Sequence, residues 1–409
     1  MDFSLEYTPE QEEFAKEVRA WLKVKLPGGL TTPADPAKLS YEQWQKRRQL
    51  SRRLGEKGWL GPTFPKEYGG GGLTIDHAIV IEKELSEYDM SLPPLYEPGM
   101  RLVAPAVSVW GTEEQKTRYL PPILKGEVIT WQLFTERGAG SDLAGLQTTA
   151  IRDGDEYVIN GEKIFVGGLH DVDQFWLLGK TDPQGPRHKN LGMFIVPSNL
   201  PGVKIAQLDL IAAGGEGGVS PGQKNLVEFQ DVRVSATCLI GQETSGWGVA
   251  NSTLEIEHGG SGGLFTHRVA DRFITYCRTD PGMVKRLQNN PELGDATVKV
   301  YIEAQVERLF ALRNYWIRHA KRKRTYEGNQ YSYYRKMFGV RLAGAMMDIL
   351  GPYAVTNDDQ IGVEEGIFEC HQRAGIITAP GGSAEIQKVR MARRIGIGRT
   401  TKEQASDAT

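Results

Sequence analysis

A short glycine segment between two hydroxyl side chains is the first place in this sequence where chemistry could be arranged. Thr135 and Ser141 flank Gly138–Gly140. The two glycines of that segment can adopt positive φ angles, and they let the backbone approach a bulky ligand closely. The hydroxyls and exposed backbone N–H groups could then donate hydrogen bonds to oxygens of the ligand. A plain glycine turn is the alternative, because short glycine motifs often occur without any function.

A glutamate in a later helical stretch is the candidate for proton transfer. At helical spacing, Glu257 shares one face of its helix with Thr253, Leu254, Gly260 and Ser261. These neighbours are small or apolar, which suits a desolvated carboxylate whose basicity is raised. The alternative is an ordinary surface or salt-bridged glutamate. Glu255 points elsewhere and is expected to be a solvated charge.

Helical patterns precede the glycine segment. Thr8, Pro9 and Gln11 form a capping box that opens the first helix. Further helices are expected over residues 41–57, 75–87 and 112–124. From about residue 130, short runs of apolar and β-branched residues alternate with turn signals, which indicates a compact β domain. Asp153-Gly154 and Asn160-Gly161 are both predicted to be hairpin turns.

Long amphipathic helices return from Gly246 onward. We expect a loop from Asp280 to Asp295 and a last helix over residues 383–394. The predicted fold class is therefore mainly α with a small β domain. The predicted boundaries are 1–129 for an N-terminal helical domain, 130–242 for a middle β-barrel or sandwich, 243–399 for a C-terminal helical bundle, and 400–409 for a flexible tail.

Composition and charge exclude several classes of function. The chain has 409 residues with 49 basic and 51 acidic side chains, a formal net charge of −2. It therefore carries no overall field for nucleic acid or an anionic membrane. Its three cysteines are widely separated and suggest neither disulfides nor a metal site. The sequence shows no signal-peptide pattern and no apolar run of the ~20 residues needed to span a bilayer. We expect a cytoplasmic protein that does not enter the membrane.

Four segments, in this order along the chain, resemble elements of the acyl-CoA dehydrogenase family. They are Gly58–Gly61 with Pro65–Gly70, Leu133–Asp142, Asp155–Lys163 and Gly382–Gln387. The second is similar to the family's Thr-Glu-Pro-Gly-Ala-Gly-Ser-Asp signature, and the resemblance runs from Thr8 to about Arg399. It implies two helical domains around a β domain, with bound FAD. It also implies α,β-dehydrogenation of an acyl-CoA thioester, with electrons passing to an electron-transfer flavoprotein.

The resemblance also assigns roles to individual residues. It implies FAD contacts at Leu133, Phe134, Thr135, Gly140, Ser141, Phe165, Val166, Gly167, Arg278, Gly351, Ser383 and Glu385. It implies substrate contacts at Ser141, Leu254, His258, Gly260 and Ser261.

The sequence departs from the family pattern at the catalytic base. Many members carry a glutamate directly before the C-terminal element, where this chain has Gly381. Other members place the base on the first long helix of the C-terminal domain, and Glu257 aligns with that position. Gly381 keeps a backbone N–H that could polarise the thioester carbonyl. His258 replaces an arginine often found beside this base, and it could pair with Glu257, bind the ligand or simply pack.

Three further departures concern the flavin. Gly167 replaces a residue whose hydroxyl is expected near flavin N5. The family's Arg-x-x-Phe-Gly segment, which reaches the flavin of a neighbouring subunit, is not recognisable, and Arg278 is only a weak substitute. The Gln-x-x-Gly-Gly segment appears as 348–352, where Asp348 would repel a pyrophosphate.

These departures leave three hypotheses open. The first is an FAD-dependent acyl-CoA dehydrogenase with Glu257 as base, assembled as a homo-oligomer or a hetero-oligomer with a related chain. The second is a half-site or non-catalytic subunit, and the third is a flavin oxidase or monooxygenase on the same fold. The glycines at 259, 260, 262 and 263 cost about 1 kcal/mol each in a helix interior. They could leave space for a bulky or branched acyl group, or could allow close helix packing.

Overall fold

The structure is a computed structural model, and its regular elements occupy three successive regions of the chain. It describes residues 7–30, 39–88, 90–95, 97–168, 170–213, 220–258, 268–320, 322, 325–355, 368, 378 and 381–397. The side chain of His258, residues 259–263 and the predicted tail lie outside what is described.

The first region is helical, as predicted. Its helices are α1 (Pro9–Lys25), α2 (Tyr41–Glu56), α3 (Ile75–Ser86), α4 (Ala104–Trp110) and α5 (Glu113–Leu124), with short turns at η2 (Lys66–Tyr68) and η3 (Gly99–Val103). The capping box is confirmed, because the Thr8 hydroxyl accepts from the backbone N–H of Gln11 while the Gln11 side chain accepts from that of Thr8.

The second region forms one sheet. Its strands are β1 (Thr130–Leu133), β2 (Thr149–Asp153), β3 (Glu156–Val166), β4 (Gln174–Lys180), β5 (Leu191–Pro197), β6 (Val203–Ala213), β7 (Ser220–Ser235) and β8 (Leu239–Ile240), with short turns η4 (Leu143–Gly145) and η5 (Ala236–Cys238). The strand order is β6-β7-β3-β2-β4-β5-β8, and β1 pairs in parallel with β4.

Of the two predicted hairpin turns, only the one at Asp153-Gly154 exists, between β2 and β3. The prediction at Asn160-Gly161 was wrong, because β3 continues through both residues. Its pairing with β7 shifts register there, as in a β-bulge. Gly161 has a φ of 140°, and a Cβ at this position would lie 2.6 Å from Oγ1 of Thr148. The glycine is therefore required by a close backbone approach inside a strand.

The third region is again helical. Its helices are α6 (Gly246–His258), α7 (Arg268–Thr279), α8 (Pro281–Asn289), α9 (Pro291–His319), α10 (Glu327–Leu350) and α12 (Ala384–Arg394), with the short turn η6 (Gly351–Val355). The loop predicted over residues 280–295 was wrong, because α8 occupies most of it. Asp280 caps α8 by accepting from the N–H of Met283 at 2.8 Å, and Pro281 fits the first turn. Proline and asparagine here mark helix ends and starts rather than a loop.

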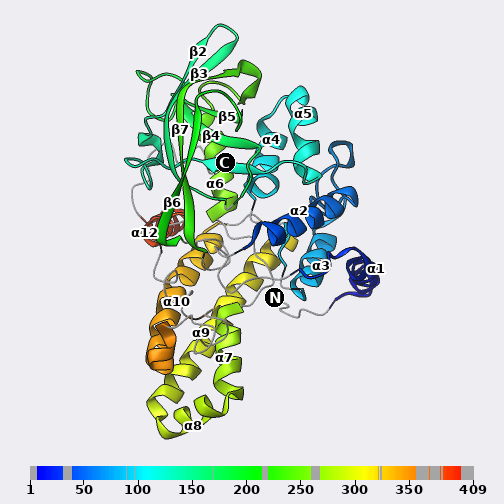
Figure 1. Ribbon diagram of the computed structural model, residues 1–409, viewed down its shortest axis with the longest axis vertical. Helices are drawn as coiled ribbons and strands as arrows, with labels where there is room; N and C mark the ends of the chain where they lie inside the picture. The colour runs from blue at the N-terminus through cyan, green and yellow to red at the C-terminus, as the bar shows by residue number, and fades with distance from the viewer. Residues whose placement is uncertain are drawn as a thin grey trace.

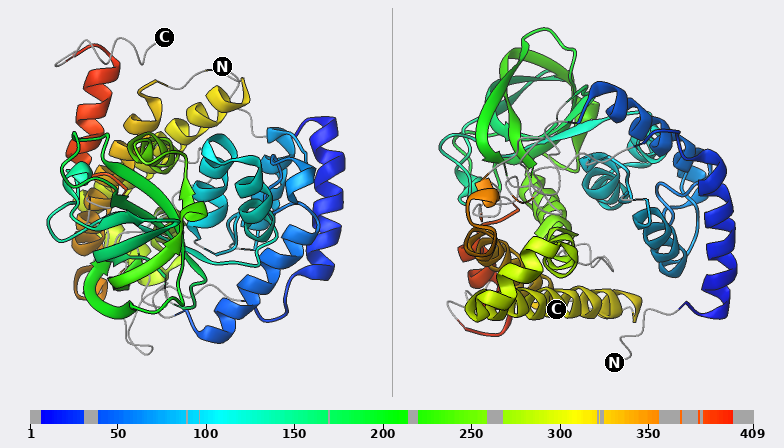
Figure 2. Two further views of the ribbon diagram at one scale, coloured as in Figure 1. Left: turned by 90° about the horizontal axis from the view of Figure 1, so that it is seen from above. Right: turned by 60° about the horizontal axis from the view of Figure 1, so that its bottom comes forward.

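Figure 1 shows the sheet at one end of the molecule, with helices α1 to α5 beside it and helices α7 to α10 extending away from it. Seen from the direction of the right-hand panel of Figure 2, the two helical regions lie on opposite sides with the sheet above both. These elements match the predicted order of helices, sheet and helices.

Helix α6 joins the three regions. Val249 and Ala250 are fully buried in a core that also contains Leu120 of α5 and Trp176 of β4. The start of the helix lies directly on β5, since a Cβ at Gly246 would come within 2.4 Å of the Leu191 carbonyl oxygen. The glycine thus lets α6 sit close to the sheet, which fixes the direction in which its far end, with Glu257, projects.

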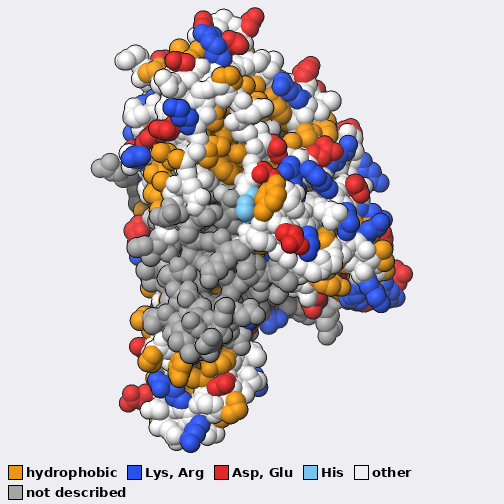
Figure 3. Space-filling view, in the orientation of Figure 1, with side chains coloured by type: hydrophobic (Ala, Val, Ile, Leu, Met, Phe, Trp, Pro, Cys, Tyr) orange, Lys and Arg blue, Asp and Glu red, His pale blue; other side chains and the backbone are white. Residues whose placement is uncertain are grey.

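The surface carries no field of a single sign on the face seen in Figure 3, where acidic and basic side chains are intermixed between hydrophobic patches. Among the described residues, no helix is both long and apolar enough to cross a lipid bilayer.

Candidate active site

The loop after β1 holds the glycine segment. Leu133 and Phe134 are buried, whereas Gly140 and Ser141 are exposed. A Cβ placed on Gly138 or Gly140 would meet no atom within 4 Å. The loop is therefore open on its glycine side, and a flat ligand could lie against its backbone.

A buried ion pair anchors this loop to the sheet. Lys163 is fully buried on β3, and its ammonium donates to the Glu136 carboxylate at 2.8 Å and to the Phe134 carbonyl at 3.0 Å. Glu136 also accepts from the N–H of Thr148 at 2.9 Å and from that of Gln147. Burial lowers the pKa of Lys163 despite the nearby carboxylate. Burial acts to raise the pKa of Glu136, but the charge of Lys163 and the hydrogen bonds together lower it. The backbone on both sides of Thr135 is thereby fixed.

The end of β3 forms a second wall next to this loop. Val166 is buried, whereas Phe165 is 52% exposed and has a φ of 58°. The Asn225 side chain on β7 donates to the carbonyls of Gly168 at 2.9 Å and Val166 at 3.3 Å. A Cβ at Gly168 would lie 2.1 Å from the indole nitrogen of Trp131. Asn225 and the indole of Trp131 therefore hold the backbone of residues 166–168 from two sides.

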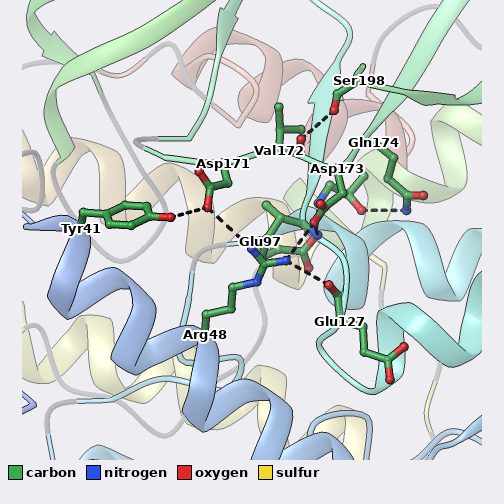
Figure 4. Close-up of polar contacts among 11 residues, drawn as sticks. Tyr41, Arg48, Glu97, Glu127, Asp171, Val172, Asp173, Gln174 and Ser198 are labelled. Carbon is green, nitrogen blue, oxygen red and sulfur yellow. Dashed lines mark hydrogen bonds and ion pairs between the residues drawn. The ribbon is translucent and has the colours of Figure 1, made fainter. Parts of the chain in front are cut away.

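The segment that follows this wall is fastened to α2 by polar contacts drawn in Figure 4. Arg48 donates to the Glu127 carbonyl at 3.0 Å and to Asp173 at 3.2 Å, and it lies 3.7 Å from Asp171. Tyr41 donates to Asp171 at 3.1 Å. Asp173 in turn accepts from the N–H of the residue before β1 at 2.7 Å. One arginine thus ties α2 to the segments leading into both β1 and β4.

Glu257 lies at the end of α6 and contacts the end of β1. The side-chain amide of Gln132 donates to its carboxylate at 3.0 Å. Earlier on the same helix, Thr253 is fully buried and Leu254 is half-buried against the core, while Glu257 itself is half-buried. The side chain of Glu255 is 65% exposed, as expected, but it is not a lone charge because it pairs with Arg394 of α12 at 3.2 Å.

Gly381 occupies a tight turn before α12. It and Gly382 have φ angles of 65° and 74°. The fully buried Gln387 donates to the Gly381 carbonyl at 3.0 Å and is held by Asn329 of α10 at 2.6 Å. Ser383 caps α12 by accepting from the N–H of Ile386 at 3.3 Å, and Glu385 is exposed. The turn is thus fixed by α12 itself.

The other predicted flavin contacts lie elsewhere. Arg278 is exposed in the last turn of α7, and Gly351 ends α10 with a φ of 64°. Asp348 is exposed beside it, and Arg286 of α8 donates to the Ile349 carbonyl at 2.9 Å. Between described residues, no hydrogen bond or ion pair joins Arg278 or Gly351 to Glu257 or Gln132.

Sequence reasoning missed most of the residues that hold this site. Lys163 could have been found, because alternation along β3 places it on the same buried face as Tyr157 and Ile159. Asn225 and Arg48 carry no such signal, since their partners are far away in the sequence. The contact of Gln132 with Glu257 spans 125 positions and is equally invisible.

The donor set fits a flavin nucleotide. Thr135 and Ser141 offer hydroxyls, and within the described residues the N–H groups of Gly140 and Ser141 donate to no other group of the chain. The open glycines provide room for a ring system, and the end of β3 provides a second side. Hydroxyl and N–H donors suit the ring oxygens and phosphates of FAD.

An open glycine loop beside a sheet, with a carboxylate brought to it by a helix, is an arrangement suited to an oxidoreductase that removes hydrogen from an organic substrate. The chain matches the family models for the acyl-CoA dehydrogenase N-terminal domain at residues 8–127, the middle domain at 132–217 and the C-terminal domain at 244–396. It therefore belongs to the acyl-CoA dehydrogenase family, and the fold class and enzyme class predicted from the sequence are confirmed.

Relatives and solved structures agree with this assignment. IpdE1 of Mycobacterium tuberculosis, named an acyl-CoA dehydrogenase, is 29% identical over 402 residues, which is 96% of this chain and 99% of IpdE1. FadE29 of the same organism, also so named, is 34% identical over 254 residues, but that match spans only 62% of each chain. A structure described as the Tcur3481-Tcur3483 steroid ACAD is 28% identical with a TM-score of 0.78, covering 98% of this chain and 100% of that one.

Proposed function

We propose that this chain is an FAD-dependent acyl-CoA dehydrogenase in which Glu257 is the catalytic base. The observation that carries the proposal is the 3.0 Å hydrogen bond from Gln132 to Glu257. Gln132 is followed at once by Leu133–Ser141, the segment proposed to bind the flavin. The contact therefore sets a carboxylate beside the cofactor loop, where the family reaction needs one.

FAD, when bound, supplies the acceptor for a hydride at its N5 atom. The chain's own residues would do the rest. Glu257 takes the proton from the α-carbon of the thioester, and the electron pair of that C–H bond forms the new double bond as the β-hydrogen leaves as hydride. The N–H of Gly381 would donate to the thioester carbonyl and stabilise the negative charge that develops on its oxygen. Thr135, Ser141 and the residues 165–167 would hold the flavin, and Leu254 would contact the acyl group.

A bulky or branched acyl group is the proposed substrate class. One structural relative, described as a steroid ACAD, supports it. The small residues after Glu257 support it from the sequence, although Gly260 and Ser261 lie outside the described residues. An electron-transfer flavoprotein is the proposed electron acceptor.

Replacement of Glu257 by glutamine tests the mechanism. Glu257→Gln keeps the shape of the side chain and an acceptor for Gln132, but it cannot take a proton. We expect the variant to bind FAD and acyl-CoA normally, with flavin reduction in anaerobic stopped-flow experiments slowed by about 10³-fold or more. Glu255→Gln is the matched control on the same helix and should reduce at the normal rate. Unchanged reduction in Glu257→Gln would remove this residue from the mechanism.

A second candidate function is one half of a hetero-oligomer. The exposed carboxylate of Asp348 next to Gly351 favours it, because this segment is unsuited to a pyrophosphate. The related structure, the Tcur3481-Tcur3483 steroid ACAD, is named after two components. The test is to purify this chain alone and record its visible spectrum. About one flavin per chain would support a self-sufficient enzyme, whereas a protein that stays colourless with added FAD would indicate a missing partner chain.

A further inference from the structure

Three successive backbone carbonyls of the turn before α12 accept hydrogen bonds from one residue, Gln387. Its side-chain amide donates to the carbonyls of Gly381 at 3.0 Å and Gly382 at 3.4 Å. Its backbone N–H donates to the carbonyl of Ser383 at 3.0 Å. In a trans peptide the N–H lies opposite to the C=O, so the N–H groups of residues 382–384 point away from Gln387. One residue thus sets the direction of a row of backbone donors.

This turn needs an outside constraint because two of its residues are glycines. Gly381 and Gly382 have φ angles of 65° and 74°, and glycine reaches such angles as easily as negative ones. A Cβ built on Gly381 would meet no atom within 4 Å, so side-chain packing does not select the conformation of this residue. The hydrogen bonds from Gln387 select it instead. They also limit where the N–H of Gly381, in the peptide group just before, can lie.

The orientation of the Gln387 amide is set in turn by Asn329 of α10. Gln387 is fully buried and Asn329 nearly so, and Nδ2 of Asn329 donates to Oε1 of Gln387 at 2.6 Å. Because the amide oxygen accepts from this donor, the amide NH₂ group faces the turn. At the far end of α12, Arg394 donates to the carbonyl of Thr325, close to the start of α10. Helix α12 is therefore held on α10 at both of its ends.

We propose that Asn329 and Gln387 are positioning residues that aim the backbone N–H of Gly381 at the carbonyl oxygen of the acyl thioester. The proposal rests on the proposed role of this N–H as the donor that stabilises charge on that oxygen, and it adds the side chains that place it. Donors stabilise a developing negative charge most when they are already oriented and need not reorganise during the reaction. A turn with two glycines does not provide this by itself, whereas a buried amide with hydrogen bonds at both of its ends does.

The test follows the carbonyl of a bound thioester that cannot react. Acetyl-CoA carries the thioester but no β-carbon, so it cannot be dehydrogenated. With ¹³C at its carbonyl, the C=O stretching band is separated from protein bands by subtracting the infrared spectrum of the complex with unlabelled acetyl-CoA. A hydrogen bond polarises the carbonyl and lowers its stretching frequency. We expect this shift when acetyl-CoA saturates the wild-type protein with its FAD bound.

Two variants remove the positioning contacts one at a time. Gln387→Met keeps the length of the side chain but cannot donate, and it should lose most of the shift. Asn329→Leu leaves the Gln387 amide without the donor that orients it, and it should lose part of the shift. Gln330→Leu is the matched control on α10, because Gln330 accepts from Arg313 of α9 at 2.8 Å, and it should keep the shift. A purely structural role would lower the free energy of unfolding and leave the carbonyl band of the folded variants unchanged.

A wild-type carbonyl band in Gln387→Met would overturn the proposal, and so would equal losses in Asn329→Leu and Gln330→Leu. No shift in the wild-type protein would overturn it as well, since Gly381 would then polarise no thioester carbonyl. Should Gln387→Met fail to fold, Asn329→Leu supplies the same comparison. Glu257→Gln should keep the wild-type shift, so the outcome for the proposed base and the outcome for this turn are separate results.

Discussion

The side-chain amide of Gln132 donates to the carboxylate of Glu257 at 3.0 Å and joins the last residues of β1 to the last turn of α6. A hydrogen bond to an ionised carboxylate both orients it and favours its charged form. The residue after Gln132 begins the proposed flavin-binding segment, so this one contact sets the distance between the proposed base and that segment. It also constrains α6 at the end that is not packed on the sheet.

Gln132→Leu should therefore slow flavin reduction by roughly 10- to 100-fold, because one hydrogen bond to a charged group is worth about 1.5–3 kcal/mol. The lost donor should also raise the pKa of Glu257, moving the rising limb of the rate to higher pH. Stopped-flow reduction by acyl-CoA across a pH series measures both effects. Gln184→Leu, at an exposed loop position, is the control and should change neither. A Gln132→Leu enzyme with wild-type rate and pH profile would show that the contact does not position the base.

The ion pair of Glu136 and Lys163 should make the stability of the protein depend on pH in the acidic range. The pKa of Glu136 is lower in the folded chain than its ordinary value of 4.5. The contribution of the ionised Glu136 carboxylate to stability is thus fully present above that ordinary pKa. It is lost as the pH falls through the lowered pKa of the folded chain. We expect the free energy of unfolding, measured by urea titration, to fall steeply below about pH 4.5. Glu136→Gln should flatten this fall.

At neutral pH, Lys163→Met should lower the free energy of unfolding more than Glu136→Gln does. It leaves a buried carboxylate without its counter-charge, a change that costs about 3–5 kcal/mol. The double variant with both substitutions should recover part of the loss. Additive losses in the double variant would contradict the coupling of these two side chains.

What the sequence predicted well depended on local signals. The capping box at Thr8 and the helix starting at Ser383 need only residues within one turn of each other. The contrast between Glu255 and Glu257 followed from helical spacing alone. The mistaken hairpin at Asn160-Gly161 had the correct local signal, but its glycine is needed for a close approach to Thr148, a contact that only the folded sheet creates.

The residues that support the candidate site could not be predicted from the sequence, for a different reason. The strand pattern places a basic residue, Lys163, at a buried position. This marks Lys163 as unusual, but it does not identify its partner. Asn225 and Arg48 contact segments far away in the chain, and nothing in their immediate surroundings marks them. The proposed flavin contacts came from the family resemblance, whereas the means of holding them came from the structure.

We expect Asn225 to hold the backbone at the end of β3 in place. It is buried and donates to two backbone carbonyls at the proposed flavin wall. Asn225→Asp has the same shape but cannot donate, and it places a carboxylate against two carbonyl oxygens. We expect it to destabilise the fold by about 1–3 kcal/mol and to weaken FAD binding. Urea unfolding and the fluorescence of released flavin measure the two effects, and Asn225→Ala should be the milder variant. Equal FAD affinity in all three proteins would contradict the role.

Arg48 should couple α2 to the segment before β4 more strongly than a surface ion pair could. Its side chain is only 12% exposed and contacts Asp173 at 3.2 Å. A double-mutant cycle with Arg48→Met and Asp173→Asn isolates their interaction from the other bond of Asp173, the one accepted from the chain before β1. We expect a coupling free energy of about 1–2 kcal/mol, because the pair is partly removed from water. The same cycle on Lys16 and Glu13, a highly exposed pair on α1, should give no measurable coupling. If Arg48 and Asp173 behaved like that surface pair, the link between α2 and the end of β3 would have to lie in the packing of Tyr41 and Trp44 on His170 instead.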